Sequence, residues 1–246
     1  MWVYRTGKYQ TDRQVILYNY QKTRKADHSR EFLKDFRGVC VTDGYQAYHT
    51  LEGELEDLEI SGCWAHSRRR YDEAVKALPK SEQKMSLAYL ALSQIQQIYH
   101  EEAELQDMTP AERRKHRQKF IKPLVDAYFN WIRINIDKVM PKSKTYNGMT
   151  YSLNQEKYLR RFLDDGEIPI DNNAADQSIR SFCIGKKNWV MCDTINGAKS
   201  SAIIYSLVET AKANKLRLYE YFNYLLTEIP EHMDDKNNDF CEKLLS

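Results

Sequence analysis

Long apolar runs are missing from this 246-residue sequence. No hydrophobic stretch approaches the ~20 residues that a membrane-spanning helix needs, and the chain does not open on a charged-then-apolar signal segment. With 42% hydrophobic and 29% charged residues, the composition is that of an ordinary globular protein. We therefore expect a cytoplasmic protein without a membrane partner, built as one large domain or as a domain with an appendage.

Cysteine is also scarce, and the spacing of the cysteines argues against disulfide bonds and structural zinc. The five cysteines are odd in number, scattered, and include no CxxC pair. This pattern argues against a disulfide framework and for a reducing compartment. Cys63 and His66 have half the spacing of a zinc site, but no second Cys/His pair accompanies them, so we do not expect structural zinc.

The chain also lacks a strong excess of positive charge, since its net charge is only +2. Any nucleic-acid contact must therefore come from local clusters. Three basic clusters qualify, and each has the alternative interpretation of a solvated helix face or, for the last, a turn before a strand. They are Arg68-Arg69-Arg70, the run of residues 113–119, and Lys186-Lys187 beside Trp189.

The first third of the chain predicts alternating strands and helices. Residues 2–4 and 14–20 are β-branched and aromatic and predict a hairpin. Residues 27–36 predict a short helix, and residues 39–42 and 60–64 predict two further strands, the first wholly apolar as in buried parallel sheets. This order indicates an α/β layer fold.

Helices dominate the middle and the end of the chain. Apolar residues recur at helical spacing from Met85 to Tyr99, which predicts a core-facing stripe. Thr109-Pro110-Ala111-Glu112 is a capping box with proline at the first helical position, and Pro123 predicts a kink or restart. Helices are also expected over 151–162, 200–214 and 219–227, with a turn at residues 196–197.

The stretch of residues 166–180 combines several helix-boundary signals. Gly166 is typical of a helix stop, and residues 171–173 are three candidate N-caps in a row. A helix from about residue 174 would place Asp176 in its first turn, where the helix dipole favours a charged carboxylate. Arg180 follows one turn later and can pair with it.

Asp43 directly follows the apolar strand of residues 39–42. Asp-Gly is a common turn pair, so a turn is the ordinary interpretation. In open α/β sheets, however, sites gather beyond the carboxyl ends of strands. A carboxylate at that place can reach a metal ion, and both interpretations stay open at this point.

Five motifs occur in order along the chain. They are VTDGYQAY from Val41, CWAHSRR from Cys63, IDNNAAD from Ile170, GKKNW from Gly185 and AIIYSLVETAKAN from Ala202. Together they resemble the transposases of the insertion sequence 66 family over nearly the whole chain. The resemblance implies an RNase H-like mixed sheet, incomplete because its first strand is missing, with a helical insertion at about 72–165 and a C-terminal helical hairpin. It implies a catalytic core over 1–187 and a C-terminal region over 188–246.

The resemblance also implies a site for DNA cleavage and strand transfer with two Mg²⁺ or Mn²⁺ ions. Asp43 matches the second acid of the family's Asp-Asp-Glu triad, and Asp176 matches the third. His66 matches a CxxH element that implies substrate contact near the site. The residues expected to bind DNA are Arg68, Arg69, Arg180, Lys186 and Lys187.

Two departures from the family pattern lead us to expect impaired activity. Asp176 stands where glutamate is usual, and a shift on the order of 1 Å in a catalytic group can cost ~10²-fold in rate. In the family, the first acid of the triad lies upstream of the segment that matches residues 2–5, so we expect this chain to lack it. We therefore expect a nucleoid-associated DNA-binding chain that self-associates or is complemented by an upstream polypeptide. The alternatives are a non-catalytic DNA-binding or regulatory remnant and a structural protein whose acids only cap helices.

Overall fold

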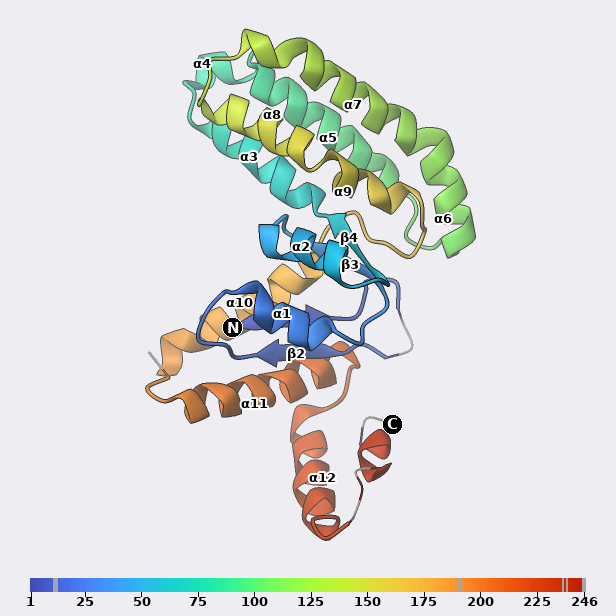
Figure 1. Ribbon diagram of the computed structural model, residues 1–246, viewed down its shortest axis with the longest axis vertical. Helices are drawn as coiled ribbons and strands as arrows, with labels where there is room; N and C mark the ends of the chain where they lie inside the picture. Colours follow the sequence, from blue (N-terminus) through green and yellow to red (C-terminus); the bar gives the residue numbers. More distant parts are fainter. Residues whose placement is uncertain (11–12, 190–191, 236, 238, 245–246) are drawn as a thin grey trace. The chain divides into compact units, whose positions relative to one another are not determined.

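The computed structural model describes residues 1–10, 13–189, 192–235, 237 and 239–244, without the side chains of residues 186–189, 242 and 243. The chain forms two compact units. The larger unit is Arg24–Asn173, and the smaller unit joins Met1–Thr23 to Ala174–Ser246. Each has hydrophobic clusters of its own, and Figure 1 shows the elements of both.

The smaller unit begins with the predicted hairpin. Strands β1 (Trp2–Arg5) and β2 (Ile16–Asn19) pair antiparallel, with Trp2 opposite Asn19 and Arg5 opposite Ile16. Helices α10 (Asn173–Trp189, in this unit from Ala174 onward), α11 (Ile195–Ala213) and α12 (Leu218–Glu231) follow, then a 3₁₀ turn (Asp239–Lys243). The hairpin and the two C-terminal helices are confirmed.

Polar side chains of α11 cover the edge of β2 that does not face β1. Thr210 Oγ1 accepts from Ile16 N at 2.9 Å and donates to Ile16 O at 3.1 Å. Ser206 Oγ accepts from Tyr18 N at 2.8 Å, and Asn214 bonds the backbone two residues before the strand. Because Ser206, Thr210 and Asn214 are four residues apart, they lie along one helix face and satisfy backbone groups that a further strand would otherwise pair.

The larger unit contains a parallel strand pair. Strands β3 (Gly38–Thr42) and β4 (Leu58–Gly62) run in register from Gly38 opposite Leu58 to Thr42 opposite Gly62. Helix α1 (Ala26–Leu33) precedes them, and α2 (Gln46–Glu54) connects them. The strands and α1 confirm the predicted elements, whereas α2 was not predicted from the sequence. A mixed α/β architecture is thus confirmed.

A body of helices follows β4 in the larger unit. Thr109 and Glu112 form the predicted capping box, and Pro123 stands at the start of a new helix after a π-helical turn, as expected. The α-helices are α3 (Trp64–Lys76), α4 (Lys80–Gln83), α5 (Leu87–Ala103), α6 (Pro110–His116), α7 (Lys122–Asn135), α8 (Lys144–Asn154) and α9 (Glu156–Arg160). The π turn is Arg117–Ile121, and 3₁₀ turns are Ile136–Lys138 and Arg161–Leu163.

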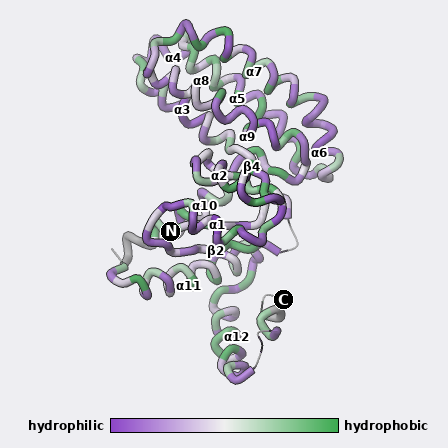
Figure 2. The backbone as a smooth tube through the Cα atoms, viewed as in Figure 1, coloured by the Kyte–Doolittle hydropathy of each residue, from purple (hydrophilic) through white to green (hydrophobic). Residues whose placement is uncertain are grey.

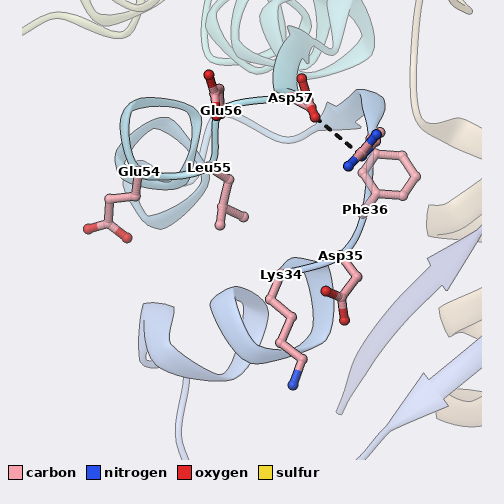
Figure 3. A pocket seen from close by; sticks show the side chains of 8 residues that line it. Lys34, Asp35, Phe36, Glu54, Leu55, Glu56 and Asp57 are labelled. Atoms are coloured by element: carbon pink, nitrogen blue, oxygen red, sulfur yellow. Dashed lines mark ion pairs between the residues drawn. The ribbon is translucent and has the colours of Figure 1, made fainter.

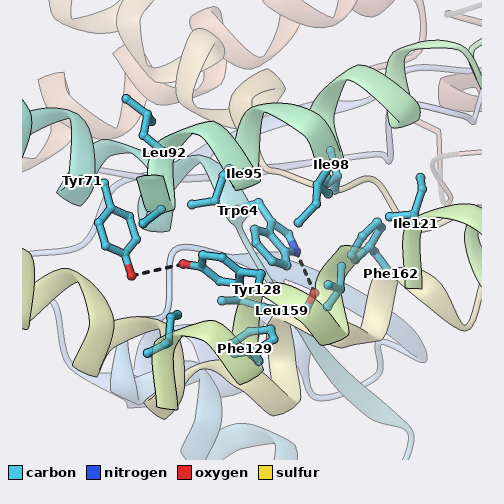
Figure 4. Close-up of a cluster of buried hydrophobic side chains, with 14 of the residues drawn as sticks. Trp64, Tyr71, Leu92, Ile95, Ile98, Ile121, Tyr128, Phe129, Leu159 and Phe162 are labelled. Atoms are coloured by element: carbon cyan, nitrogen blue, oxygen red, sulfur yellow. Dashed lines mark hydrogen bonds between the residues drawn. The ribbon is translucent and has the colours of Figure 1, made fainter. Parts of the chain in front are cut away.

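Aromatic side chains form the centre of this helical body (Figure 4). Trp64 is fully buried, and its Nε1 donates to Leu159 O at 2.7 Å. Tyr128 and Tyr71, also fully buried, are joined through their hydroxyls at 3.2 Å. Most of the predicted stripe on α5 is core, but Met85 is 80% exposed because it precedes the helix.

Two arginines of the basic run lie inside the protein. Arg113 donates to the carbonyls of Leu105, Met108 and Gly166. The interpretation of the run as one solvated or phosphate-contacting face is therefore wrong for Arg113 and Arg117, although Arg114 on the same segment is exposed. A guanidinium carries five donors, so it can satisfy several buried carbonyls at once.

Two predicted turns are helical instead. Residues 186–189 continue α10, so the turn before a strand is wrong there. Asn196 and Gly197 lie in the first turn of α11, because Thr194 Oγ1 accepts from Gly197 N at 3.0 Å and caps the helix. A cap one residue before the helix thus outweighs the Asn-Gly turn preference.

Candidate metal and nucleic-acid site

The carboxyl ends of β3 and β4 bring two of the sequence motifs to one edge of the parallel pair. Thr42 is opposite Gly62 in the register, so Asp43 and Cys63 follow at the same edge. This is the edge where ligands bind in open α/β sheets. The placement supports the expectation that Asp43 lies at a site rather than only in a connecting turn.

Asp43 is held by a tight turn and by α8. Its Oδ1 accepts from Tyr45 N at 3.0 Å, and its backbone carbonyl accepts from Tyr151 Oη at 3.1 Å. Gly44 has φ +78°, a value that favours glycine. The turn interpretation is therefore confirmed locally. The side chain is half-buried and, within the described part of the chain, forms no ion pair, so carboxylate oxygen remains available to a ligand.

The stretch before α10 docks onto the start of α3. Trp64 N donates to Ile170 O at 3.1 Å, and Asn172 N donates to the Cys63 sulfur at 3.4 Å. Burial raises the pKa of the Cys63 thiol to about 12, so the sulfur is a neutral thiol at pH 7. The bond between Trp64 and Ile170 thus brings Ile170 next to Cys63, although these two residues are 107 positions apart in the chain.

Asp171 links this stretch to α5, a contact that the sequence did not reveal. Tyr99 Oη donates to Asp171 Oδ2 at 2.9 Å, and Asp171 Oδ1 accepts from Asn173 N at 3.1 Å. Burial and the neighbouring Asp171 carboxylate raise the pKa of Tyr99. The capping role predicted for Asp171 is confirmed by the bond to Asn173, whereas no local pattern could indicate a partner 72 residues away.

Asp176 belongs to the smaller unit, and Asp43 belongs to the larger one. As predicted, Asp176 lies in the first turn of α10, where a helix dipole favours a carboxylate. Its side chain is half-buried. Arg180 is exposed one turn later. Arg5 Nη1 donates to Ala174 O at 3.1 Å and fastens β1 to the start of this helix.

Exposed arginines begin one turn into α3. Arg68 and Arg69 are exposed, and the Arg70 guanidinium lies 4.1 Å from the centre of the Tyr151 ring. Burial raises the pKa of Tyr151 to about 12; Cys63 and Asp43 raise it further, and Arg70 lowers it. His66 is half-buried on the same helix. The predicted DNA-binding side chains of Lys186 and Lys187 lie outside the described residues.

A hollow of about 270 Å³ in the larger unit is unrelated to these residues (Figure 3). It is lined by residues 34–37, after α1, and by residues 54–57, from the last residue of α2 onward. Charged side chains surround it, and Arg37 Nε pairs with Asp57 at 3.2 Å. None of the predicted site residues lines it.

The donor chemistry of the two aspartates fits a hard divalent cation, because Mg²⁺ and Mn²⁺ prefer carboxylate oxygens. Among the residues that the structure describes, no group of three or more His, Cys, Asp or Glu side chains could hold a metal ion. Each unit therefore offers one of the predicted acids, and neither has a complete ligand set of its own.

Comparison with known proteins identifies the family. The profile of the Transposase IS66 family matches residues 1–200, and that of the IS66 C-terminal element matches residues 206–246. Over the described residues, no helix is both long enough and apolar enough to cross a membrane. No solved structure matches the chain.

Three relatives come from Sinorhizobium fredii. Uncharacterized protein y4qI is 29% identical over 224 residues, covering 88% of this chain and 40% of the relative. Uncharacterized protein y4jD is 27% identical over 220 residues, covering 87% and 42%, and y4hP is 22% identical over 228 residues, covering 89% and 41%. The chain thus spans about two fifths of the length of these relatives. Since the family profile covers residues 1–200, the chain belongs to the IS66 transposase family.

Proposed function

We propose that this chain carries part of a site for metal-dependent DNA strand cleavage and strand transfer, with Asp43 and Asp176 as metal ligands. Membership of the transposase family supports the reaction class. The observation that carries the site is Asp43, a half-buried carboxylate outside any ion pair in the described chain, at the carboxyl edge of β3. An RNase H-like core is part of the same proposal.

The metal ions would be held by carboxylate oxygens of Asp43 and Asp176 and would polarise the phosphate and activate the attacking oxygen. The protein's contribution near Asp43 is to hold that carboxylate in one orientation. The Tyr45 N–H fixes one oxygen, and the Tyr151 hydroxyl fixes the backbone behind it. Such fixed ligands lower the reorganisation required when charge develops on the phosphate.

DNA would approach along the exposed part of α3. Arg68 and Arg69 are exposed there, and Arg70 lies over the Tyr151 ring, which itself contacts Asp43. Arginine forms bidentate bonds to phosphate, so this surface can position a strand beside the carboxylate without reading its sequence. Arg180 is proposed to make a similar contact from α10, and His66 to contact the substrate.

The test is Mg²⁺-dependent nicking of DNA that carries transposon ends, with Mn²⁺ as a second metal. Asp43→Ala and Asp176→Ala are each expected to abolish nicking, whereas Asp107→Ala, at an exposed carboxylate outside the site, should not change it. Salt-dependent DNA binding without nicking in any variant would instead favour the non-catalytic DNA-binding role.

Complementation by further polypeptide is part of the proposal. In the described residues each sheet has two strands. Because α11 covers the outer edge of β2, a strand from elsewhere would pair with β1 or with the parallel pair of β3 and β4. A third acid on such a strand would complete the ligand set. We expect weak nicking by this chain alone and stronger nicking when it is joined to the polypeptide preceding this region in a longer relative. Equal activity of the two proteins would contradict complementation. The roles of Asp43 and Asp176 would still be tested by their alanine variants.

A further inference from the structure

Two tyrosines hold Asp43, and each of them has an arginine over its ring. Tyr45 N donates to Asp43 Oδ1 at 3.0 Å, and Tyr151 Oη donates to the Asp43 carbonyl at 3.1 Å. The Arg24 guanidinium lies 5.0 Å from the centre of the Tyr45 ring. The Arg70 guanidinium lies 4.1 Å from the centre of the Tyr151 ring. Both distances are within the ~6 Å over which an aromatic face attracts a cation, so two guanidinium groups from separate segments are held beside one carboxylate.

Arg24 belongs to a short basic segment in front of α1. Lys25 follows it directly, α1 begins at the next residue, and both basic side chains are exposed. Tyr45 Oη donates to the Arg24 carbonyl at 2.8 Å, so the same tyrosine fixes the backbone of this arginine and supports its side chain. The bond joins residues 21 positions apart. The turn around Asp43 therefore gains a cation that its own stretch of sequence does not contain.

Arg70 reaches the same turn from α3. This helix is mainly hydrophilic (Figure 2), and Arg70 is exposed on it. Within the described residues, neither Arg70 nor Arg24 forms an ion pair or donates a side-chain hydrogen bond. Other arginines of the larger unit, such as Arg133 and Arg161, are paired with glutamates. The donors of Arg24 and Arg70 are therefore available to an anionic ligand.

We propose that Arg24 and Arg70 bind DNA phosphates beside Asp43, with Tyr45 and Tyr151 as their aromatic supports. The inference rests on the proposed function and adds residues that place the strand at that site. A guanidinium held over a ring presents its planar fork of donors in advance, so less side-chain entropy is lost when it forms bidentate bonds to phosphate. Because both tyrosines also hold Asp43, the strand is positioned relative to the carboxylate. Such contacts fix the register of a strand without reading its sequence.

The experiment measures binding of the full chain to a fluorescein-labelled DNA duplex of arbitrary sequence, by anisotropy in EDTA over a series of salt concentrations. Each phosphate contact contributes about 0.9 to the slope of log Kd against the logarithm of the salt concentration. Arg24→Gln and Arg70→Gln should each lower that slope by about one, and the double variant should lower it by about two. Arg37→Gln is the matched control and should leave the slope unchanged. Arg37 is exposed and precedes the first residue of β3, at the end of the strand opposite to Asp43.

Substitutions of Tyr45 test the aromatic support separately from the charge. Tyr45→Leu removes the ring but keeps the Arg24 guanidinium and the backbone N–H that bonds Asp43. It should weaken DNA binding about two- to fivefold. Tyr45→Phe keeps the ring and should bind DNA more tightly than Tyr45→Leu does. Equal affinities of these two variants, both with the wild-type circular dichroism spectrum, would contradict the role of the ring.

The outcomes separate these phosphate contacts from the cleavage chemistry. A salt slope that neither arginine variant changes, or a wild-type chain that does not bind the duplex, would overturn the proposal. If the slope is unchanged while Asp43→Ala abolishes nicking, the cleavage site stands without these contacts. If both arginine variants lower the slope while no protein nicks DNA, the contacts stand and the proposed cleavage fails.

Discussion

Replacing Arg117 with methionine should strongly destabilise the larger unit, because this guanidinium is fully buried. It donates through Nε to Glu102 at 2.9 Å and through Nη1 to the carbonyls of Phe162 and Asp165 at 2.8 and 2.7 Å. Glu102 is only 6% exposed, so the substitution leaves a carboxylate inside the protein without its cation.

The expected loss can be estimated from that stranded charge. Breaking a buried ion pair from one side costs about 3–5 kcal/mol, a large share of the 5–15 kcal/mol that stabilises a typical domain. Arg117→Met should therefore lower the melting temperature by about 10 °C. In the double variant Arg117→Met/Glu102→Leu, no buried charge remains, and at least about half of the loss should be recovered.

Urea unfolding followed by circular dichroism measures both free energies. Arg114→Met is the matched control, since Arg114 belongs to the same basic run but is exposed, and its substitution should change stability by less than about 0.5 kcal/mol. If Arg117→Met unfolds like Arg114→Met, or if adding Glu102→Leu makes the protein still less stable, the argument from a stranded carboxylate is refuted.

Three further predictions concern the turn beside Asp43, the capping box and the buried thiol. Gly44→Ala should cost about 1–2 kcal/mol and reduce nicking, because φ is +78° and a Cβ would lie 2.9 Å from Tyr151 Oη; Gly53→Ala, with nothing within 4 Å of a Cβ, should be neutral or slightly stabilising by the same unfolding assay. Thr109→Ala should cost about 1 kcal/mol in a thermal melt, since it removes the cap of α6, and no loss would count against the capping box. The folded Cys63 thiol, with its pKa raised to about 12 by burial, keeps its proton at a pH where the unfolded thiol loses it. The unfolding free energy should therefore fall from roughly pH 8.5 toward 12, and the slope of that fall, measured by urea titrations, should be shallower for Cys63→Ala.

The sequence was sufficient for elements whose signals are local. The capping box at Thr109 and the hairpin strands could be predicted because their signals are hydrogen bonds and side-chain alternation within a few residues. The helix that carries Asp176 was predicted for the same reason. Where two local signals competed, as at Asn196-Gly197, the sequence alone favoured a turn, and the cap from Thr194 decided for a helix.

Local sequence signals could not show which arginines of the basic run, residues 113–119, are buried and which are exposed. Arg113 and Arg114 are adjacent and chemically identical, but one lies inside against the Gly166 carbonyl and the other faces solvent. Which one is buried depends on where a backbone 53 residues away passes. The sequence therefore predicts the charge, while packing between distant segments decides its environment.

The sequence and the tertiary structure likewise account for different parts of the candidate site. The sequence by itself determined that Asp43 follows an apolar strand and that Asp176 lies in the first turn of a helix, because both follow from short-range patterns. Only the tertiary structure showed that Tyr151 holds the Asp43 backbone and that Asn172 bonds the Cys63 sulfur. Those contacts join residues more than 100 positions apart. Local sequence patterns do not indicate which distant segments come together when such long loops close.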